Sequence, residues 1–211
     1  MVRILFLFCA GFLLFGSCKS ETKVTASTPE KVDQTKTKKV GANNLIGFKE
    51  NNAVTSGGKL VEIPGLADEK QSTYFLVRHA EKIKGVKNPG LTDAGLARAA
   101  KLAALLSGLQ IDQIMSTDYK RTQATVAPLA KAHKLNVQSY DPSMQKDLFT
   151  DLTVFNKQNV VVVGHSNTIP KLANILIGKE VIENYPESEY SQLIIVSLSQ
   201  PGMASFERFT F

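Results

Sequence analysis

The sequence YFLVRHAEK, residues 74–82, organises the chain, because a short apolar run is followed at once by an arginine, a histidine and a carboxylate. Residues 73–77 are β-branched, aromatic or aliphatic at every position, which is typical of a strand buried on both faces. The change of polarity at Arg78 marks the carboxyl end of that strand. In an open α/β sheet, ligands bind beyond the carboxyl ends of the strands. A cation and an imidazole at this end therefore indicate an anion-binding site.

A second apolar run, NVVVVGH at residues 159–165, also ends in a histidine, His165. Ser166 and Asn167 then offer helix caps, and Pro170 fits the first turn of a helix. Strands are also expected at 111–116, 135–140, 192–198 and 205–211, with helices starting near Thr92, before Arg121 and near Ser143. Strands that alternate with helices predict an α/β fold, a three-layer α/β/α sandwich with a mainly parallel central sheet.

The first 40 residues predict export. Residues 1–17 combine a basic start, an apolar run too short to span a bilayer and a small-residue cleavage site, which is the pattern of a signal peptide. Cys18, directly after Gly-Ser, resembles the lipidated cysteine of a bacterial lipoprotein, and an ordinary signal peptide cut nearby is the alternative. Residues 18–40, the lipid-attachment cysteine and a flexible tether, contain too few apolar residues to order themselves. We expect an exported lipoprotein of the bacterial cell envelope, held at a membrane through Cys18.

The composition limits which partners and sites the rest of the chain, residues 41–211, can have. The formal net charge of +6 says little about partners, and no nucleic-acid partner is expected. Of the two cysteines, one lies in the leader and the other is Cys18, so the folded part has neither a disulfide framework nor a thiolate metal site. Residues 41–72 contain two short extended pieces and form an N-terminal extension of uncertain role. Residues 73–211 form the predicted domain, for which no metal or cofactor is expected.

Four motifs follow one another through this domain: YFLVRHAE at 74–81, LTDAG at 91–95, STDYKRT at 116–122 and VGHSN at 163–167. Together and in this order they resemble the histidine phosphatase, or phosphoglycerate mutase-like, superfamily. Each motif alone is weak, but the four cover the domain from Thr73 to its end. Because the domain is short, it has little room for the insertions that enclose the substrate in mutases. The resemblance therefore implies the compact phosphatase branch and an open site.

The resemblance also implies roles for four residues. His79 would be the nucleophile that forms a phosphohistidine, and Arg78, Arg121 and His165 would surround the phosphoryl group. The chemistry suits these residue types, because cationic neighbours disfavour the protonated, non-nucleophilic imidazole and a guanidinium matches the geometry of phosphoryl oxygens. The alternatives are that Arg121 is an exposed helical arginine and that His165 merely ends a strand. The third histidine, His133, is interpreted as surface structure.

Cleavage of an ester also needs a group that protonates the leaving oxygen and later activates water, and one carboxyl group can serve both steps. Many relatives place this acid just after the third strand, which points to Asp141. Glu81 lies beside the nucleophile and is the second choice, and Asp147 is a third. Asp141 could instead simply start a turn. The sequence leaves this assignment open.

These observations predict an envelope-anchored phosphoric monoester hydrolase that acts through a phosphohistidine intermediate. Its partner would be a phosphorylated small molecule or a phosphorylated envelope component. The alternative is a non-catalytic phosphate-binding or scaffold lipoprotein with the same fold, which the presence of both histidines and both arginines disfavours.

Overall fold

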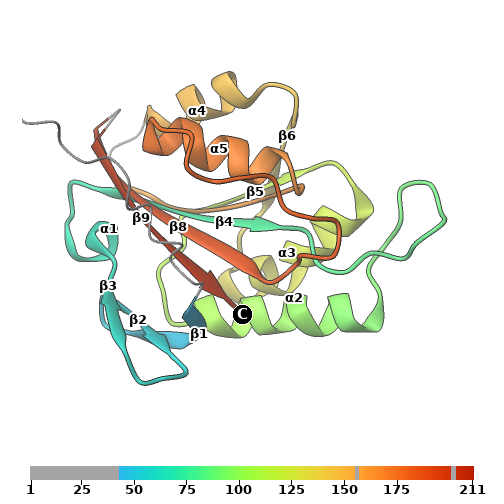
Figure 1. Ribbon diagram of the computed structural model, residues 1–211, viewed down its shortest axis with the longest axis horizontal. Coiled ribbons are helices and arrows are strands. Elements are labelled where there is room, and N and C mark those ends of the chain that lie inside the picture. The colour runs from blue at the N-terminus through green and yellow to red at the C-terminus, as the bar shows by residue number, and fades with distance from the viewer. Residues whose placement is uncertain (1–42, 155–156, 201–202) are drawn as a thin grey trace, which may run out of the picture. The chain divides into compact units, whose positions relative to one another are not determined.

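The computed structural model describes residues 43–154, 157–200 and 203–211 (Figure 1). The predicted signal peptide, the lipidation at Cys18 and the tether lie outside these residues. Within the part of the chain that is described, no helix is long and apolar enough to cross a membrane.

The described residues form a nine-stranded sheet in the order β3-β2-β1-β9-β8-β4-β7-β5-β6. The strands are β1 (Asn43–Lys49), β2 (Asn52–Thr55), β3 (Leu60–Glu62), β4 (Ser72–Arg78), β5 (Gln113–Thr117), β6 (Val137–Tyr140), β7 (Asn159–Gly164), β8 (Gln192–Gln200) and β9 (Met203–Thr210). Strands β4, β7, β5 and β6 are mutually parallel. Strand β8 runs antiparallel to both β4 and β9, so the start of β8 lies beside the carboxyl end of β4.

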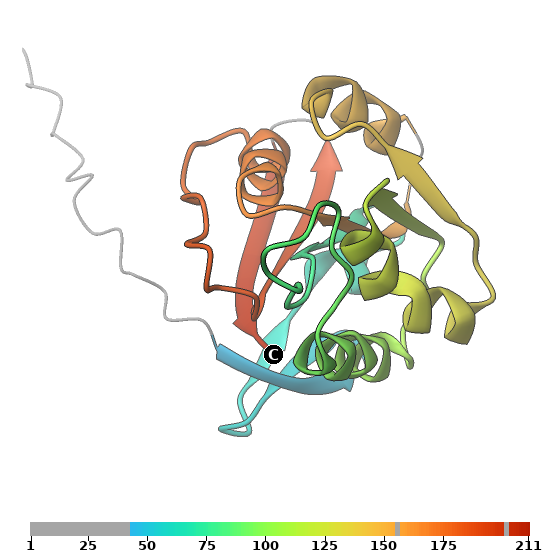
Figure 2. The same ribbon diagram turned by 90° about the vertical axis from the view of Figure 1, so that its right-hand side faces the viewer.

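Helices cover both faces of the sheet (Figures 1 and 2). They are α1 (Pro64–Ala67), α2 (Asp93–Leu106), α3 (Lys120–His133), α4 (Gln145–Thr153) and α5 (Thr168–Ile177). Helices α2 and α3 pack on one face, and α4 and α5 on the other. Helix α2 starts next to Thr92, as predicted, and Thr92 caps it, its hydroxyl accepting a hydrogen bond from the Gly95 N–H at 3.2 Å. The predicted α/β/α sandwich is confirmed.

Strand β4 is buried along its whole length because its side chains serve both faces of the sheet. Phe75 and Val77 pack into the cluster formed with α2 and α3. Tyr74 and Leu76 pack into the cluster formed with α4 and α5. Each such side chain contributes about 1.5–3 kcal/mol when fully buried, so the strand that leads to Arg78 is firmly held.

Two features differ from the prediction. The sheet is mixed, not mainly parallel, because β8 and the β1–β2–β3 meander add antiparallel pairs to the four parallel strands. The N-terminal extension, whose role the sequence left open, adds β1, β2 and β3 to the sheet, since β1 pairs in parallel with β9. Strand β2 and the one-turn helix α1 were not expected from the sequence.

Candidate active site

The carboxyl ends of β4 and β7 bring two histidines together. Arg78 pairs with Gly164 across these parallel strands, so His79 and His165 follow at the same level of the sheet. Their ring centroids are 5.7 Å apart. The segment Pro186–Ser191 leads into β8, the other neighbour of β4, and lies against Arg78.

His79 is almost fully buried, with 2% of its surface exposed. Its Nδ1 lies 2.8 Å from the carbonyl oxygen of Ala80. Because a carbonyl can only accept a hydrogen bond, Nδ1 carries the proton and the lone pair is on Nε2. Burial lowers the pKa of His79 to about 3, helped by the charges of Arg78 and Arg121 and opposed by the hydrogen bond to Ala80. The imidazole is therefore neutral at physiological pH and can act as a nucleophile.

His165 is held by a chain of hydroxyl groups. Its Nε2 lies 3.1 Å from Thr117 Oγ1, which donates to Thr122 Oγ1, and Thr122 in turn donates to the carbonyl oxygens of Thr117 and Tyr119. This direction of donation places the His165 proton on Nε2. The other nitrogen, Nδ1, lies 3.3 Å from Arg121 Nη2 and accepts from it. Burial, with Arg121 and Arg78, lowers the pKa of His165 to about 4, so this ring is neutral too.

Arg78 is enclosed by the segment that precedes β8. Its Nη1 contacts the carbonyl oxygens of Pro186, Glu187 and Glu189 at 3.0, 3.1 and 2.7 Å. Its Nη2 donates to Glu187 Oε2 at 2.8 Å, and the guanidinium carbon lies 4.1 Å from the ring centroid of Tyr190. The guanidinium is thus fixed in position beside His79.

Arg121, at the start of α3, stacks on Tyr119 at 4.5 Å. In the described part of the chain, the buried Nε atoms of both Arg78 and Arg121 have no hydrogen-bond partner. Buried polar atoms are nearly always satisfied, and a guanidinium N–H pairs best with an oxyanion. Two such donors beside a neutral histidine form a site suited to a phosphoryl group.

Glu81 is not available as a free acid. Arg98 binds its carboxylate with Nε at 2.9 Å and Nη2 at 2.7 Å. Partial burial acts to raise the pKa of Glu81, but the hydrogen bonds from Arg98 outweigh it and hold the pKa below its usual range. Glu81 therefore links the end of β4 to α2.

Asp141 is not brought to the site either, contrary to the favoured assignment from sequence. Strands β7 and β5 separate β6 from β4, which places the two strands about 14 Å apart. The Asp141 carboxylate is exposed and accepts hydrogen bonds from the hydroxyl and N–H of Ser143, which lower its pKa. Its position is that of a residue that starts a turn. Asp147 is exposed in the first turn of α4, the helix that follows β6 in the chain.

His133 ends α3, and at 1.5 Å per residue it lies roughly 20 Å along the helix from Arg121. Sequence reasoning missed Glu187, Tyr190 and Thr117, which contact Arg78 or His165. Thr117 stands in the STDYKRT motif at 116–122, to which no contact with His165 was assigned. The run PESEY at 186–190, just before β8, was the only signal for Glu187 and Tyr190, and it points to the site only if β8 is known to lie antiparallel to β4. Among the described residues, no three His, Cys, Asp or Glu side chains are grouped to hold a metal ion.

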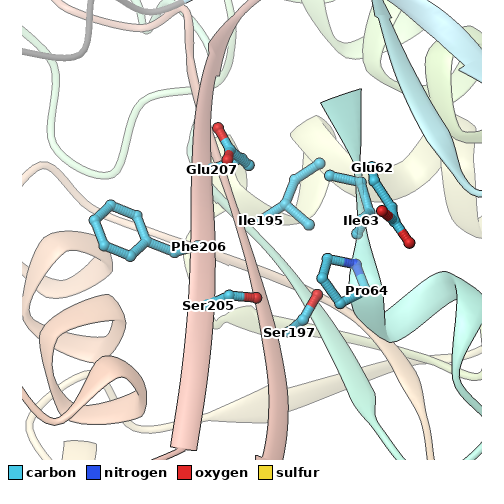
Figure 3. Close-up of a pocket in the computed structure, with 8 residues that line it drawn as sticks. All are labelled: Glu62, Ile63, Pro64, Ile195, Ser197, Ser205, Phe206 and Glu207. Atoms are coloured by element: carbon cyan, nitrogen blue, oxygen red, sulfur yellow. The ribbon is translucent and has the colours of Figure 1, made fainter. Parts of the chain in front are cut away.

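A pocket elsewhere lies between β3, β8 and β9 (Figure 3). It is lined by Glu62–Pro64, by Ile195 and Ser197, and by Ser205–Glu207. Ser197 pairs with Thr73 at the start of β4, which places the pocket about 20 Å along the strand from His79. This pocket therefore belongs to the opposite end of the sheet.

Comparison with known proteins gives a family match over part of the chain and a shared fold. Residues 74–142 match the family model of the histidine phosphatase superfamily (branch 1). A search of curated proteins found no match. Among solved structures, the protein histidine phosphatase SixA in complex with tungstate is similar at a TM-score of 0.54, with 18% identity over 65% of this chain and 96% of that one.

Two further structures have the same fold. A phosphoglycerate mutase from Bacillus anthracis str. Sterne gives a TM-score of 0.53 at 15% identity, over 66% of this chain and 93% of that one. A phosphoserine phosphatase from Entamoeba histolytica, in complex with 3-phosphoglyceric acid, gives 0.53 at 16% identity, over 66% and 97%. The predicted resemblance to the histidine phosphatase superfamily is thus confirmed, by the family match over residues 74–142 and by the fold that the chain shares with these proteins.

Proposed function

We propose that this protein is a phosphatase of the cell envelope that transfers a phosphoryl group to His79 and then hydrolyses the phosphohistidine. The observation that carries the proposal is the neutral His79, whose Nε2 lone pair lies among two guanidinium groups with unpartnered Nε donors. The match to the histidine phosphatase family model supports the same chemistry.

The steps follow from these positions. The Nε2 lone pair attacks phosphorus while Arg78 and Arg121 bind the phosphoryl oxygens, on which negative charge must be stabilised in the transition state. His165 contacts Arg121 and so lies beside the group that binds the phosphoryl oxygens. Water then attacks the phosphohistidine, which releases inorganic phosphate and restores His79.

For the substrate we propose a phosphomonoester of a small molecule or a phosphorylated envelope component. Glu187 at the mouth of the site has a side chain that is 63% exposed, which suits a substrate that extends into solvent. The similar structures include a protein histidine phosphatase and a phosphoserine phosphatase, so phosphorylated proteins and small phosphomonoesters both belong in the screen.

The test is a phosphatase screen of the purified protein against phosphorylated metabolites and phosphopeptides, with radiolabelled phosphate followed onto the protein. We expect turnover of at least one class and transient label on His79. Inactivity at neutral and acidic pH, with retained binding of inorganic phosphate or tungstate, would instead support the non-catalytic binding protein.

The envelope location is a proposal from the sequence, based on the signal-like residues 1–17 and on Cys18. We expect the mature protein to begin at an acylated Cys18, because acyl chains supply most of the membrane affinity of a lipoprotein. Mass spectrometry of the mature N-terminus tests this, and Cys18→Ala should release the protein from membranes. An unmodified terminus at another residue would contradict the proposal.

A further inference from the structure

We infer that Glu187 protonates the leaving oxygen and then activates the attacking water, an inference that rests on the proposed phosphatase function. Neither carboxylate favoured from the sequence can serve, since Glu81 is bound by Arg98 and Asp141 lies at the end of the edge strand β6.

Glu187 lies between two cationic side chains beside His79. Its Oε2 lies 2.8 Å from Arg78 Nη2, and its Oε1 lies 2.6 Å from Lys82 Nζ. Arg78 is the residue before His79, and within the described residues its buried Nε has no hydrogen-bond partner. In this structure the Glu187 carboxylate therefore occupies a place beside the guanidinium that a phosphoryl oxygen would take.

The segment that carries Glu187 is held in place from both sides. The side chain of Asn174 in α5 accepts from the N–H groups of Val181 and Ile182 and donates to the Ile182 carbonyl oxygen. Arg78 Nη1 contacts three carbonyl oxygens nearer β8. Glu189, two residues further on, has other partners: the N–H and hydroxyl of Ser191 donate to its carboxylate at 2.6 and 2.7 Å.

Substrate binding changes the protonation state of the Glu187 carboxyl group. Without substrate, the hydrogen bond from Lys82 and the charge of Arg78 lower the pKa of Glu187, so it is a carboxylate. A dianionic phosphoryl group that binds Arg78 displaces Oε2 and places negative charge beside Glu187, with Arg121 and Lys82 as the remaining nearby cations. Loss of a cationic partner and gain of a like charge both raise a carboxyl pKa. Substrate binding thus favours the protonated form that an acid needs.

The reaction then balances. His79 Nε2 forms the P–N bond as the P–O bond to the leaving group breaks, and the leaving oxygen takes its electron pair and the Glu187 proton to become an alcohol. The Glu187 carboxylate next accepts a proton from water as the water oxygen attacks phosphorus. The P–N electron pair returns to Nε2, and inorganic phosphate leaves.

The experiment is Glu187→Gln in the full-length protein, assayed with an alkyl phosphate and with p-nitrophenyl phosphate. We expect turnover of the alkyl phosphate to fall by about 10²–10⁴-fold, the usual contribution of a positioned acid. Nitrophenolate leaves without a proton, so its release in the first turnover should fall by less than about tenfold and appear as a burst. The burst also shows that the variant is folded and that His79 reacts.

Two matched variants complete the test. Glu183→Gln removes an exposed carboxylate from the same segment and should behave like the parent. Asp118→Asn removes an exposed carboxylate between β5 and α3 and should also retain turnover. The inference is overturned if Glu187→Gln hydrolyses the alkyl phosphate like the parent, or if Asp118→Asn loses that reaction in its place. A parent protein that releases neither nitrophenol from p-nitrophenyl phosphate nor phosphate from the alkyl phosphate would overturn the phosphatase proposal itself, which is a separate result.

Discussion

The ends of the central strands β4 and β7 differ sharply from the end of the edge strand β6, although all three are followed by polar residues. His79 and His165 follow strands with a neighbour on each side, and their rings are desolvated enough to stay neutral. Asp141 follows a strand with one neighbour, and its carboxylate is exposed and caps a turn. Polar residues at a strand end therefore form a reactive site only where neighbouring strands remove them from water.

The largest effect is expected from His79→Ala. Loss of the imidazole removes the covalent intermediate, so turnover of both aryl and alkyl phosphates should fall to background. Phosphate release and labelling of the protein measure this. His133→Ala, at the far end of α3, is the control and should retain activity. Labelling of the His79→Ala protein to the parent level would contradict the assignment.

Arg121→Ala should lower kcat by about 10²–10³-fold, the usual cost of losing one preorganised donor to a developing anion. Arg121→Lys keeps the charge but loses the planar fork, so its activity should lie between those of Arg121→Ala and the parent. If the lysine variant equals the parent, the geometry of the guanidinium is not used.

Acid should destabilise the protein before its carboxylates titrate. Folded His79 and His165 have pKa values of about 3 and 4, below the unfolded value near 6.5. Between pH 6.5 and about 4.5 the unfolded chain therefore binds protons that the folded chain does not. Stability is fully present above pH 6.5 and is lost as the pH falls, at up to about 1.4 kcal/mol per pH unit for each histidine.

Urea unfolding at pH 7, 6 and 5 measures this slope. His165→Asn should reduce the slope by removing one of the two protonations. A slope unchanged by that substitution would show that His165 is protonated in the folded state.

The smallest effect is expected from Asp141→Asn. The amide oxygen can still accept from Ser143, and β6 lies about 14 Å from β4, the strand that leads to His79, so activity should stay within about twofold of the parent and stability within about 1 kcal/mol. Steady-state kinetics and thermal unfolding check both. A loss of 10²-fold on an alkyl phosphate would restore Asp141 as the acid and break the contrast between central and edge strands.

The sequence was sufficient to predict the alternation of strands and helices and the strand ends at Arg78–His79 and His165, because these depend on local patterns. It could not identify the carboxylate, because that depends on strand order. Asp141 and Glu187 lie 62 and 108 residues beyond His79, and only the packing of β8 against β4 brings the second one near. Strand β2 and helix α1, of four residues each, are too short for periodicity to detect.

The hydrogen bond from His79 Nδ1 to the Ala80 carbonyl has a regiochemical consequence. Since Nδ1 is committed as a donor, only the ring nitrogen remote from Cβ can accept a phosphoryl group. The proposed intermediate would therefore be the τ isomer of phosphohistidine and not the π isomer. The two isomers differ in their ¹⁵N–³¹P coupling pattern, so NMR of the trapped intermediate would report which nitrogen the backbone leaves open.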